Sequence, residues 1–510
     1  MHRFLNIRLL APLERVLDAL TNRARGESNV IIALIAYALV WTLYGVLAKG
    51  SQDLHYDMAE QVALAREPAF GYARHPPLAA MVVKAWFSVF PLTDGSYYLL
   101  AMTVVSLTLW ITWRLLGDYL QGEKRVVGLM LLMFIPFFNF HALKFNVNTV
   151  LMPVWAATTL WFLRSYETRS VFYAALAGLG AAGAMYGKYW SIFLLGGLGI
   201  AALLDSRRGS YFRSAAPWVT IAVGLLVLAP HLLWLYQNDF SPFSFAVSQH
   251  GKKPLAAALS GTLGYLAGAA GYAALPAALA FMATRPSRSA LLDTLSPSAP
   301  HRRLAALAFW SPLLLPALVA PFAGVELVSL WTMSAWTLLP VVLLSSPLLT
   351  VTRVDAIRVL AVAVAFPVVM TLAAPAIALA IHYAGVKPAA AHSRLLANAV
   401  EHVWYQTTEQ PLRLVGGDPD LAFGVAFYSA EQPSAFPDLD NHLAPWVTPQ
   451  RLDREGIALV CNTTDQRCVA RATALAGGRG GRLEITLQRS YWGQLGDSAR
   501  YLILTVPPQK

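Results

Sequence analysis

Three carboxylates lie close together in the polar stretch that follows the first long apolar segment. Asp53, Asp57 and Glu60 are spaced so that a helix here would place all three on one face. Like charges on one face repel, so the arrangement requires a nearby cation, a bound proton or a functional use. A partly desolvated carboxylate can act as a general base toward a hydroxyl group. We therefore predict Asp57, Asp53 and Glu60 as catalytic residues; a solvated acidic helix face is the alternative interpretation.

A second set of ionisable residues follows in the same loop, where Arg74 and His75 directly precede Pro76 and Pro77. Consecutive prolines fix an extended turn, and Pro77 is suited to start the helix predicted over 78–90. Such a turn holds the preceding side chains in one direction. Arg74 and His75 are therefore predicted to bind a phosphate group, with a simple helix-start turn as the alternative.

Composition places these residues in a polytopic α-helical membrane protein. Hydrophobic residues make up 56% of the 510 residues and charged residues only 13%. Apolar stretches long enough to cross about 30 Å of hydrocarbon recur along most of the chain, which predicts about eleven spans between residues 30 and 390. These are 30–48, 97–116, 126–142, 147–163, 171–186, 189–204, 216–236, 258–283, 304–322, 326–348 and 359–385.

Lysine and arginine are concentrated in alternate loops, such as the one that contains Arg207, Arg208 and Arg213. The positive-inside rule places these loops in the cytoplasm, with residues 1–29 as a basic amphipathic segment on the same side. An odd number of spans then places residues 391–510 outside, so we predict a bacterial inner-membrane protein with a periplasmic C-terminal domain. The net charge of +11 reflects this orientation, and nucleic acid is not an expected partner.

The outward-facing loops also contain cations, for which the positive-inside rule gives no reason. One loop contains Lys144, Asn146 and Asn148, and another contains Lys188 and Tyr189. A lysine flanked by aromatic residues supplies a point charge to a phosphate, while the rings contact a sugar or an apolar chain. We predict that both lysines bind phosphate and that the other three residues bind substrate. Interfacial snorkelling is the alternative for each lysine.

Two further residues are predicted to bind substrate. His250 lies in the longest outward loop of the membrane region, beside Lys252 and Lys253, and this loop either closes over a substrate or is a flexible connector. Glu326 lies at the outward end of a predicted span, where a helix-start carboxylate favoured by the helix dipole is the alternative. No metal or other cofactor is predicted.

The composition changes near residue 390. Residues 391–510 mix short β-type runs with proline- and glycine-rich turns, which predicts a small α/β domain. Both cysteines of the chain, Cys461 and Cys468, lie in this domain, and a local disulfide and two unpaired thiols remain equally open. The β-type runs are 421–428, 456–460, 483–487 and 501–506.

The first outward loop, predicted over 49–96, resembles that of the bacterial family 39 glycosyltransferases. The resemblance rests on Tyr56-Asp57-x-Ala-Glu60 and Gly71-Tyr72-x-x-His75-Pro76-Pro77-Leu78. This group of the GT-C superfamily includes protein O-mannosyltransferases and the aminoarabinose transferase that acts on lipid A. The family has an acidic pair after its first span, and its aspartate is thought to be the catalytic base. Asp57 matches that aspartate, whereas Met58 replaces the second acid.

The resemblance implies the GT-C fold and an inverting glycosyltransferase. Such an enzyme moves a sugar from a polyprenyl-phosphate donor to a cell-envelope acceptor, such as a lipid A or lipopolysaccharide hydroxyl. Asp57 would remove the acceptor proton, while Lys144, Lys188 and His75 neutralise the leaving phosphate. A protein O-mannosyltransferase, whose acceptor is a protein, is an alternative. A flippase for a lipid-linked glycan is the alternative from another functional class. A flippase should place ionisable groups at the bilayer midplane, and most predicted spans here have no ionisable group there.

Overall fold

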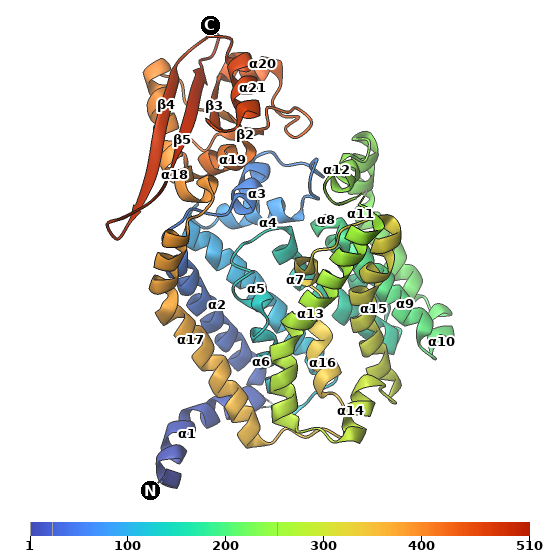
Figure 1. Ribbon diagram of the computed structural model, residues 1–510. Helices are drawn as coiled ribbons and strands as arrows, with labels where there is room; N and C mark the ends of the chain where they lie inside the picture. Colours follow the sequence, from blue (N-terminus) through green and yellow to red (C-terminus); the bar gives the residue numbers. More distant parts are fainter. Residues whose placement is uncertain (1, 23, 252, 510) are drawn as a thin grey trace. The chain divides into compact units, whose positions relative to one another are not determined.

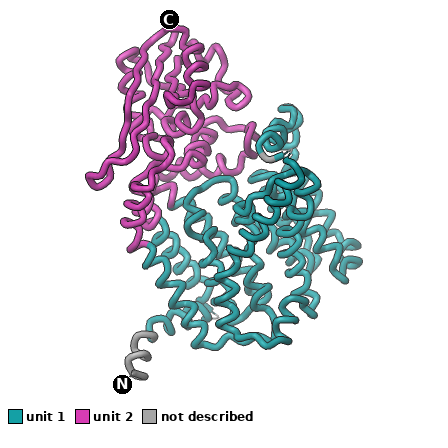
Figure 2. Tube along the Cα trace, in the orientation of Figure 1, with its two compact units in different colours: residues 1–42, 99–370 teal, residues 43–98, 371–510 magenta. Residues whose placement is uncertain are grey.

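The computed structural model describes residues 2–22, 24–251 and 253–509, with the side chains of residues 2–10 and 250 excepted. The chain forms two compact units (Figure 2). Residues 1–42 and 99–370 form one, here named the helical unit. Residues 43–98 and 371–510 form the other, here named the α/β unit. The loop predicted over 49–96 therefore belongs to the same unit as the C-terminal region, a grouping that the sequence did not predict.

Helices account for nearly all of the helical unit, and three of them, α2, α5 and α17, continue into the α/β unit (Figure 1). In chain order the helices are α1 (His2–Thr21), α2 (Gly26–Ala48), α5 (Asp94–Leu116), α6 (Gly122–Met133), α7 (Val147–Thr168), α8 (Val171–Gly187), α9 (Ile192–Leu204), α10 (Arg208–Phe212), α11 (Ala216–Gln237), α12 (Ser241–His250), α13 (Leu255–Thr284), α14 (Arg288–Leu295), α15 (Pro300–Ala323), α16 (Leu339–Leu344) and α17 (Arg353–Ala384).

Six helices in the described part of the chain are long and apolar enough to cross a membrane: α2, α5, α11, α13, α15 and α17. Large apolar side chains lie on their outer surfaces, among them Leu226, which is 75% exposed, and Phe322, which is 93% exposed. Lipid accommodates such side chains, whereas water does not. The predicted multi-pass membrane protein is thus confirmed.

Two predicted spans, 126–142 and 326–348, are not continuous helices. The first ends as a helix at Met133 and continues as the short 3₁₀ helix η1 (Pro136–Phe138). The buried Asn139 amide donates to the carbonyl oxygens of Met133 and Ile135, at 2.9 and 3.3 Å. The second contains η3 (Ser329–Thr332), η4 (Trp336–Leu338) and α16. Irregular backbone is tolerated within an apolar segment where other parts of the protein surround it. Hydropathy alone does not separate such a protein-surrounded segment from a lipid-facing helix, so both segments were predicted as spans.

The α/β unit is built around a five-stranded sheet of order β2-β1-β3-β5-β4. Strands β2, β1 and β3 are parallel, with Val415 paired to Ala435 and Ala458, whereas β5 and β4 join as an antiparallel hairpin (Figure 1). The predicted C-terminal α/β region is confirmed. The elements are α3 (Tyr56–Arg66), α4 (Leu78–Phe87), α18 (Pro388–Thr407), β1 (Leu414–Gly417), α19 (Pro419–Tyr428), β2 (Ser434–Pro437), α20 (Pro449–Glu455), β3 (Ile457–Asn462), α21 (Gln466–Ala476), β4 (Arg482–Tyr491) and β5 (Gln494–Val506).

One predicted β-type run, 421–428, is wrong, because it forms the buried helix α19. The Asp418 side chain caps this helix by accepting from the Leu421 amide at 3.1 Å, and Pro419 stands at its first position. A short apolar run does not separate a buried strand from a buried helix by periodicity. Of the two possibilities for the cysteines, the structure has the disulfide: Cys461 of β3 is bonded to Cys468 of α21.

Candidate active site

Asp57 lies in the first turn of α3. The ring of His55 caps this helix, with Nδ1 accepting from the Asp57 backbone amide at 3.2 Å. A carboxylate in the first helical turn is stabilised by the positive end of the helix dipole. The Asp57 side chain is 21% exposed, against 8% for Glu60 and 1% for Asp53. Asp57 is therefore the most accessible of the three predicted acids.

Glu60 lies where the loop after α3 folds back. The Tyr72 hydroxyl donates to the Leu64 carbonyl at 2.9 Å, and the Tyr72 amide donates to the His75 carbonyl at 3.0 Å. This turn places Arg74 Nη1 3.8 Å and His75 Nε2 3.4 Å from the Glu60 carboxylate. The predicted phosphate ligands Arg74 and His75 therefore lie beside a carboxylate that compensates their charge.

Asp53 has a different environment from Asp57. Its carboxylate accepts from the guanidinium of Arg489 and, at 3.0 Å, from the backbone amide of Arg394. Its own backbone amide donates to the Ala390 carbonyl at 2.6 Å. These bonds attach the loop between α2 and α3 to α18 and β4, all within the α/β unit. We interpret Asp53 as a structural residue and not as a base.

The structure adds two acids that the sequence analysis did not select, Asp418 and Asp420, at the start of α19. Burial, the Asp418 carboxylate and then the charges of Asp57 and Glu60 raise the pKa of Asp420 to about 6, against the opposing charge of Lys387. Asp420 thus shares the electrostatic environment of the predicted acids. In the sequence, the run Gly416-Gly417-Asp418-Pro419 indicated only a turn. It gave no reason to associate Asp418 or Asp420 with the first loop.

Tyr56, the first residue of α3, responds to the same charges. Burial, followed by the carboxylates of Asp57, Asp420 and Glu60, raises the pKa of its hydroxyl to about 12. The phenol is therefore neutral at physiological pH and retains a proton to donate.

Within the helical unit, a hydrogen bond connects the loop that contains Lys188 to the predicted loop that contains Asn148. Lys188 follows the last residue of α8, and its Nζ donates to Oδ1 of Asn148 at 2.8 Å. The ammonium also lies 5.1 Å from the centre of the Trp331 ring. Asn146 caps α7 by accepting from the Asn148 backbone amide at 2.9 Å. A lysine bound at the first turn of a long helix combines a positive charge with the positive end of the helix dipole, which suits an anion.

Lys144 lies in the loop just before α7, and the Thr149 hydroxyl donates to its backbone carbonyl at 3.3 Å. Tyr189 follows Lys188, but its hydroxyl lies 3.1 Å from Nε2 of His231 and its ring packs on His231 and Phe243. Tyr189 therefore contacts an aromatic cluster on α11 and α12, while Lys188 contacts α7.

Glu326 forms an ion pair with Lys253, whose Nζ lies 3.5 Å from the carboxylate, and the Glu326 side chain is 51% exposed. This pairing supplies a structural reason for the acid. The side chain of His250 and all of Lys252 lie outside the described residues. In the part of the chain that the structure describes, no group of three or more His, Cys, Asp and Glu residues could hold a metal ion.

These features define a class of protein: a multi-pass membrane protein with a helical unit, an acidic first loop and a C-terminal α/β region. The same fold is found in ArnT from Cupriavidus metallidurans. The structure of ArnT bound to undecaprenyl phosphate matches with a TM-score of 0.61 and 13% identity, covering 94% of this chain and 99% of that chain. The apo structure matches with a TM-score of 0.57 and 12% identity. The chain has the GT-C fold, as predicted.

Sequence comparison agrees with the fold. Residues 74–234 match the family described as dolichyl-phosphate-mannose-protein mannosyltransferase. The lipopolysaccharide core galacturonosyltransferase RgtB of Rhizobium johnstonii is 30% identical over 230 residues, which is 44% of this chain and 45% of that protein. The alignment thus spans less than half of this relative. The predicted resemblance to GT-C glycosyltransferases is confirmed, and the family match includes His75, Lys144 and Lys188 but begins after Asp57.

Proposed function

We propose that the protein is a membrane glycosyltransferase that moves a sugar from a polyprenyl-phosphate donor to a hydroxyl of a cell-envelope lipid or glycan. The observation that carries this proposal is Asp57, an accessible carboxylate at a helix N-terminus, in a chain with the GT-C fold. A solved protein of this fold binds undecaprenyl phosphate, and a relative in sequence acts on the lipopolysaccharide core. Both observations support this donor and this class of acceptor.

Asp57 acts as the general base of an inverting displacement. It takes the proton of the acceptor hydroxyl while that oxygen attacks the anomeric carbon, and the bond between this carbon and the phosphate oxygen breaks. Glu60 is less suited to this role because Arg74 and His75 already lie against its carboxylate. The Asp57 carboxylate, which lies 3.5 Å from Nδ1 of His55, is the more exposed of the two, at 21% against 8% for Glu60, and this favours Asp57 as the base.

Lys188 and Lys144 stabilise the charge that develops on the leaving phosphate. Lys188 is held by the neutral amide of Asn148, so this contact does not cancel its charge. The N-terminus of α7, which carries Asn148, adds the partial charge of its helix dipole. Positive groups fixed before the reaction contribute most where charge develops in the transition state.

We place the α/β region in the periplasm and the protein in the inner membrane. The disulfide between Cys461 and Cys468 supports this placement, because such bonds persist in oxidising compartments. The distribution of lysine and arginine among the loops supports the same orientation.

The test uses the purified full-length protein reconstituted in proteoliposomes, with radiolabelled sugar on polyprenyl phosphate or on a nucleotide. Lipopolysaccharide and a serine- and threonine-containing peptide are offered as acceptors, and products are identified by mass spectrometry. We expect transfer from the lipid-linked donor to lipopolysaccharide. Efficient transfer from a nucleotide sugar, or movement of the lipid-linked sugar between leaflets without transfer, would overturn the proposal. Transfer to the peptide alone would identify a protein O-glycosyltransferase, an acceptor that the family match also supports.

A further inference from the structure

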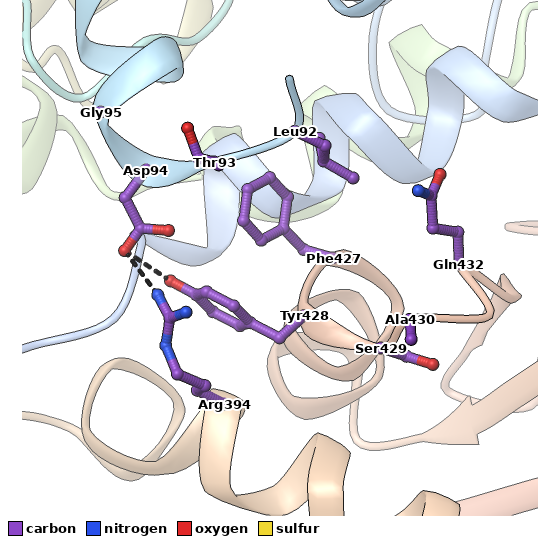
Figure 3. A pocket seen from close by; sticks show the side chains of 10 residues that line it. All are labelled: Leu92, Thr93, Asp94, Gly95, Arg394, Phe427, Tyr428, Ser429, Ala430 and Gln432. Atoms are coloured by element: carbon purple, nitrogen blue, oxygen red, sulfur yellow. Dashed lines mark hydrogen bonds and ion pairs between the residues drawn. The ribbon is translucent and has the colours of Figure 1, made fainter.

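A pocket separate from Asp57 lies within the α/β unit, between the start of α5 and the end of α19 (Figure 3). Its volume is about 420 Å³, which is within the usual range for small-molecule sites. Its wall combines charged, amide, hydroxyl and aromatic groups. The residues that supply them include Thr93, Asp94, Arg394, Phe427, Tyr428 and Gln432.

The charged groups of this wall compensate each other. Arg394 Nη2 lies 3.0 Å from Asp94 Oδ2, and the Tyr428 hydroxyl donates to the same oxygen at 3.1 Å (Figure 3). The Arg394 guanidinium also lies 4.3 Å from the centre of the Tyr428 ring. Fixed donors and acceptors without surplus charge suit a neutral ligand rich in hydroxyl groups, whereas phosphate or a carboxylate would require an excess of cations.

Aromatic rings form another part of the wall. The rings of Phe427 and Tyr428 lie 4.9 Å apart and almost perpendicular (Figure 3). An apolar ring face beside polar groups matches a pyranose, which presents C–H groups on its faces and hydroxyls around its edge.

The backbone of Gln432 supplies an independent observation. Its φ is +48°, in the left-handed region that glycine adopts freely and other residues adopt rarely. A glutamine at such a position, on the wall of a pocket, suggests that its amide has a use. This amide can both donate to and accept from sugar hydroxyls.

We propose that this pocket binds one neutral sugar ring of the acceptor, an inference that rests on the proposed glycosyl transfer. The end of the first loop forms part of the pocket wall at Thr93 and Asp94, and α18 ties the wall to Asp53, because the Arg394 backbone amide donates to the Asp53 carboxylate at 3.0 Å. Holding a sugar of the acceptor here would orient the rest of the acceptor within the α/β unit, which also carries Asp57. A bound acceptor reacts faster because its orientation is fixed before the chemical step.

The test measures binding without transfer, by saturation-transfer NMR on the full-length protein in detergent. The probes are methyl α-mannoside, methyl β-glucoside and N-acetylglucosamine, with galacturonate and inorganic phosphate as anionic probes. We expect at least one neutral probe to bind and both anions to bind more weakly. Ala430→Trp fills the pocket from an exposed position and should weaken binding more than 10-fold. Gln432→Gly removes the amide without backbone strain and should weaken it ~5-fold, as expected for one hydrogen bond.

Gln450→Ala is the matched control, since Gln450 is exposed on α20 and does not line the pocket. Absence of binding of every neutral probe, preferential binding of an anion, or unchanged binding in both pocket variants would overturn the inference. The outcome is separable from that of the proposed function. Sugar binding that is lost in Ala430→Trp supports the pocket even if no transfer is detected. Transfer with an unchanged acceptor KM in Ala430→Trp rejects the pocket and retains the enzyme.

Discussion

The α/β unit and the helical unit carry opposite kinds of candidate groups. In the α/β unit, Asp57, Glu60 and Asp420 are close enough for their charges to act on one another. In the helical unit, the selected groups are mainly lysines and amides, and Lys188 is bound to Asn148. Under the proposed function, proton transfer is assigned to residues of the α/β unit and phosphate binding to residues of the helical unit.

The same comparison separates cations that the sequence analysis grouped together. Arg74 and His75 lie 3.8 and 3.4 Å from the Glu60 carboxylate, so both side chains already face an acid. Lys188 has a neutral amide as its hydrogen-bond partner. The contacts of Lys188 therefore differ from those of Arg74 and His75, and mutation can test whether this difference matters for binding an anion.

The largest effect is expected for Asp57→Asn. The amide preserves shape and cannot accept a proton at neutral pH, so the transfer rate should fall at least ~100-fold, the usual contribution of a general base. The melting temperature should change less than in Asp53→Asn, because the Asp57 side chain is 21% exposed and that of Asp53 only 1%. Transfer assays and thermal unfolding in detergent measure the two quantities. Glu484→Gln, on the exposed edge of β4, is the matched control, and near-normal turnover of Asp57→Asn would reject this base.

Lys188→Ala should come next, with a loss of roughly 10- to 100-fold in turnover, because a fixed positive group beside the leaving phosphate is removed. Lys188→Arg should recover part of the rate, since it restores the charge. Lys144→Ala should act in the same direction. His75→Gln should cost less than either alanine variant, because Glu60 already compensates His75. If His75→Gln is the most damaging of the set, the proposed division between the units is wrong.

Asp53→Asn should affect stability and not chemistry directly. Asp53 is buried against Arg489, which is itself only 16% exposed, and loss of one partner from a buried ion pair costs about 3 kcal/mol. Thermal unfolding should show a clear decrease that Asp57→Asn does not show. The double variant Asp53→Asn with Arg489→Gln should be less destabilised than the sum of the single changes, because no unpaired charge remains. Additive losses would argue against this pairing.

The sequence predicted the membrane fold and the α/β region, because apolar length and turn residues are local signals, whereas the roles assigned to residues of the first loop stay predictions. It did not predict that the first loop packs with the C-terminal region, because contacts between distant segments leave no local pattern. Asp53 illustrates the limit: its spacing from Asp57 suggested chemistry, and only the fold reveals Arg394 and Arg489 as its partners. Asp420 was missed for the same reason.

The smallest effect is expected for Asp420→Asn, which tests the acidic side of the comparison. The pKa of Asp420 is raised from 3.8 to about 6, so between these values the folded protein binds more protons than the unfolded chain. Stability therefore falls as the pH rises through this window, and the unfavourable contribution is complete above pH 6. Asp420→Asn should remove it, with a gain of about 1 kcal/mol at pH 7.5, allowing for solvent screening of a partly exposed group. This gain should disappear near pH 4.

Thermal unfolding at both pH values measures the gain in stability of Asp420→Asn. The control is Glu409→Gln, which changes an exposed acid before β1. An equal gain at both pH values would show that the pKa of Asp420 is not raised in the folded protein, and would remove it from the group that includes Asp57.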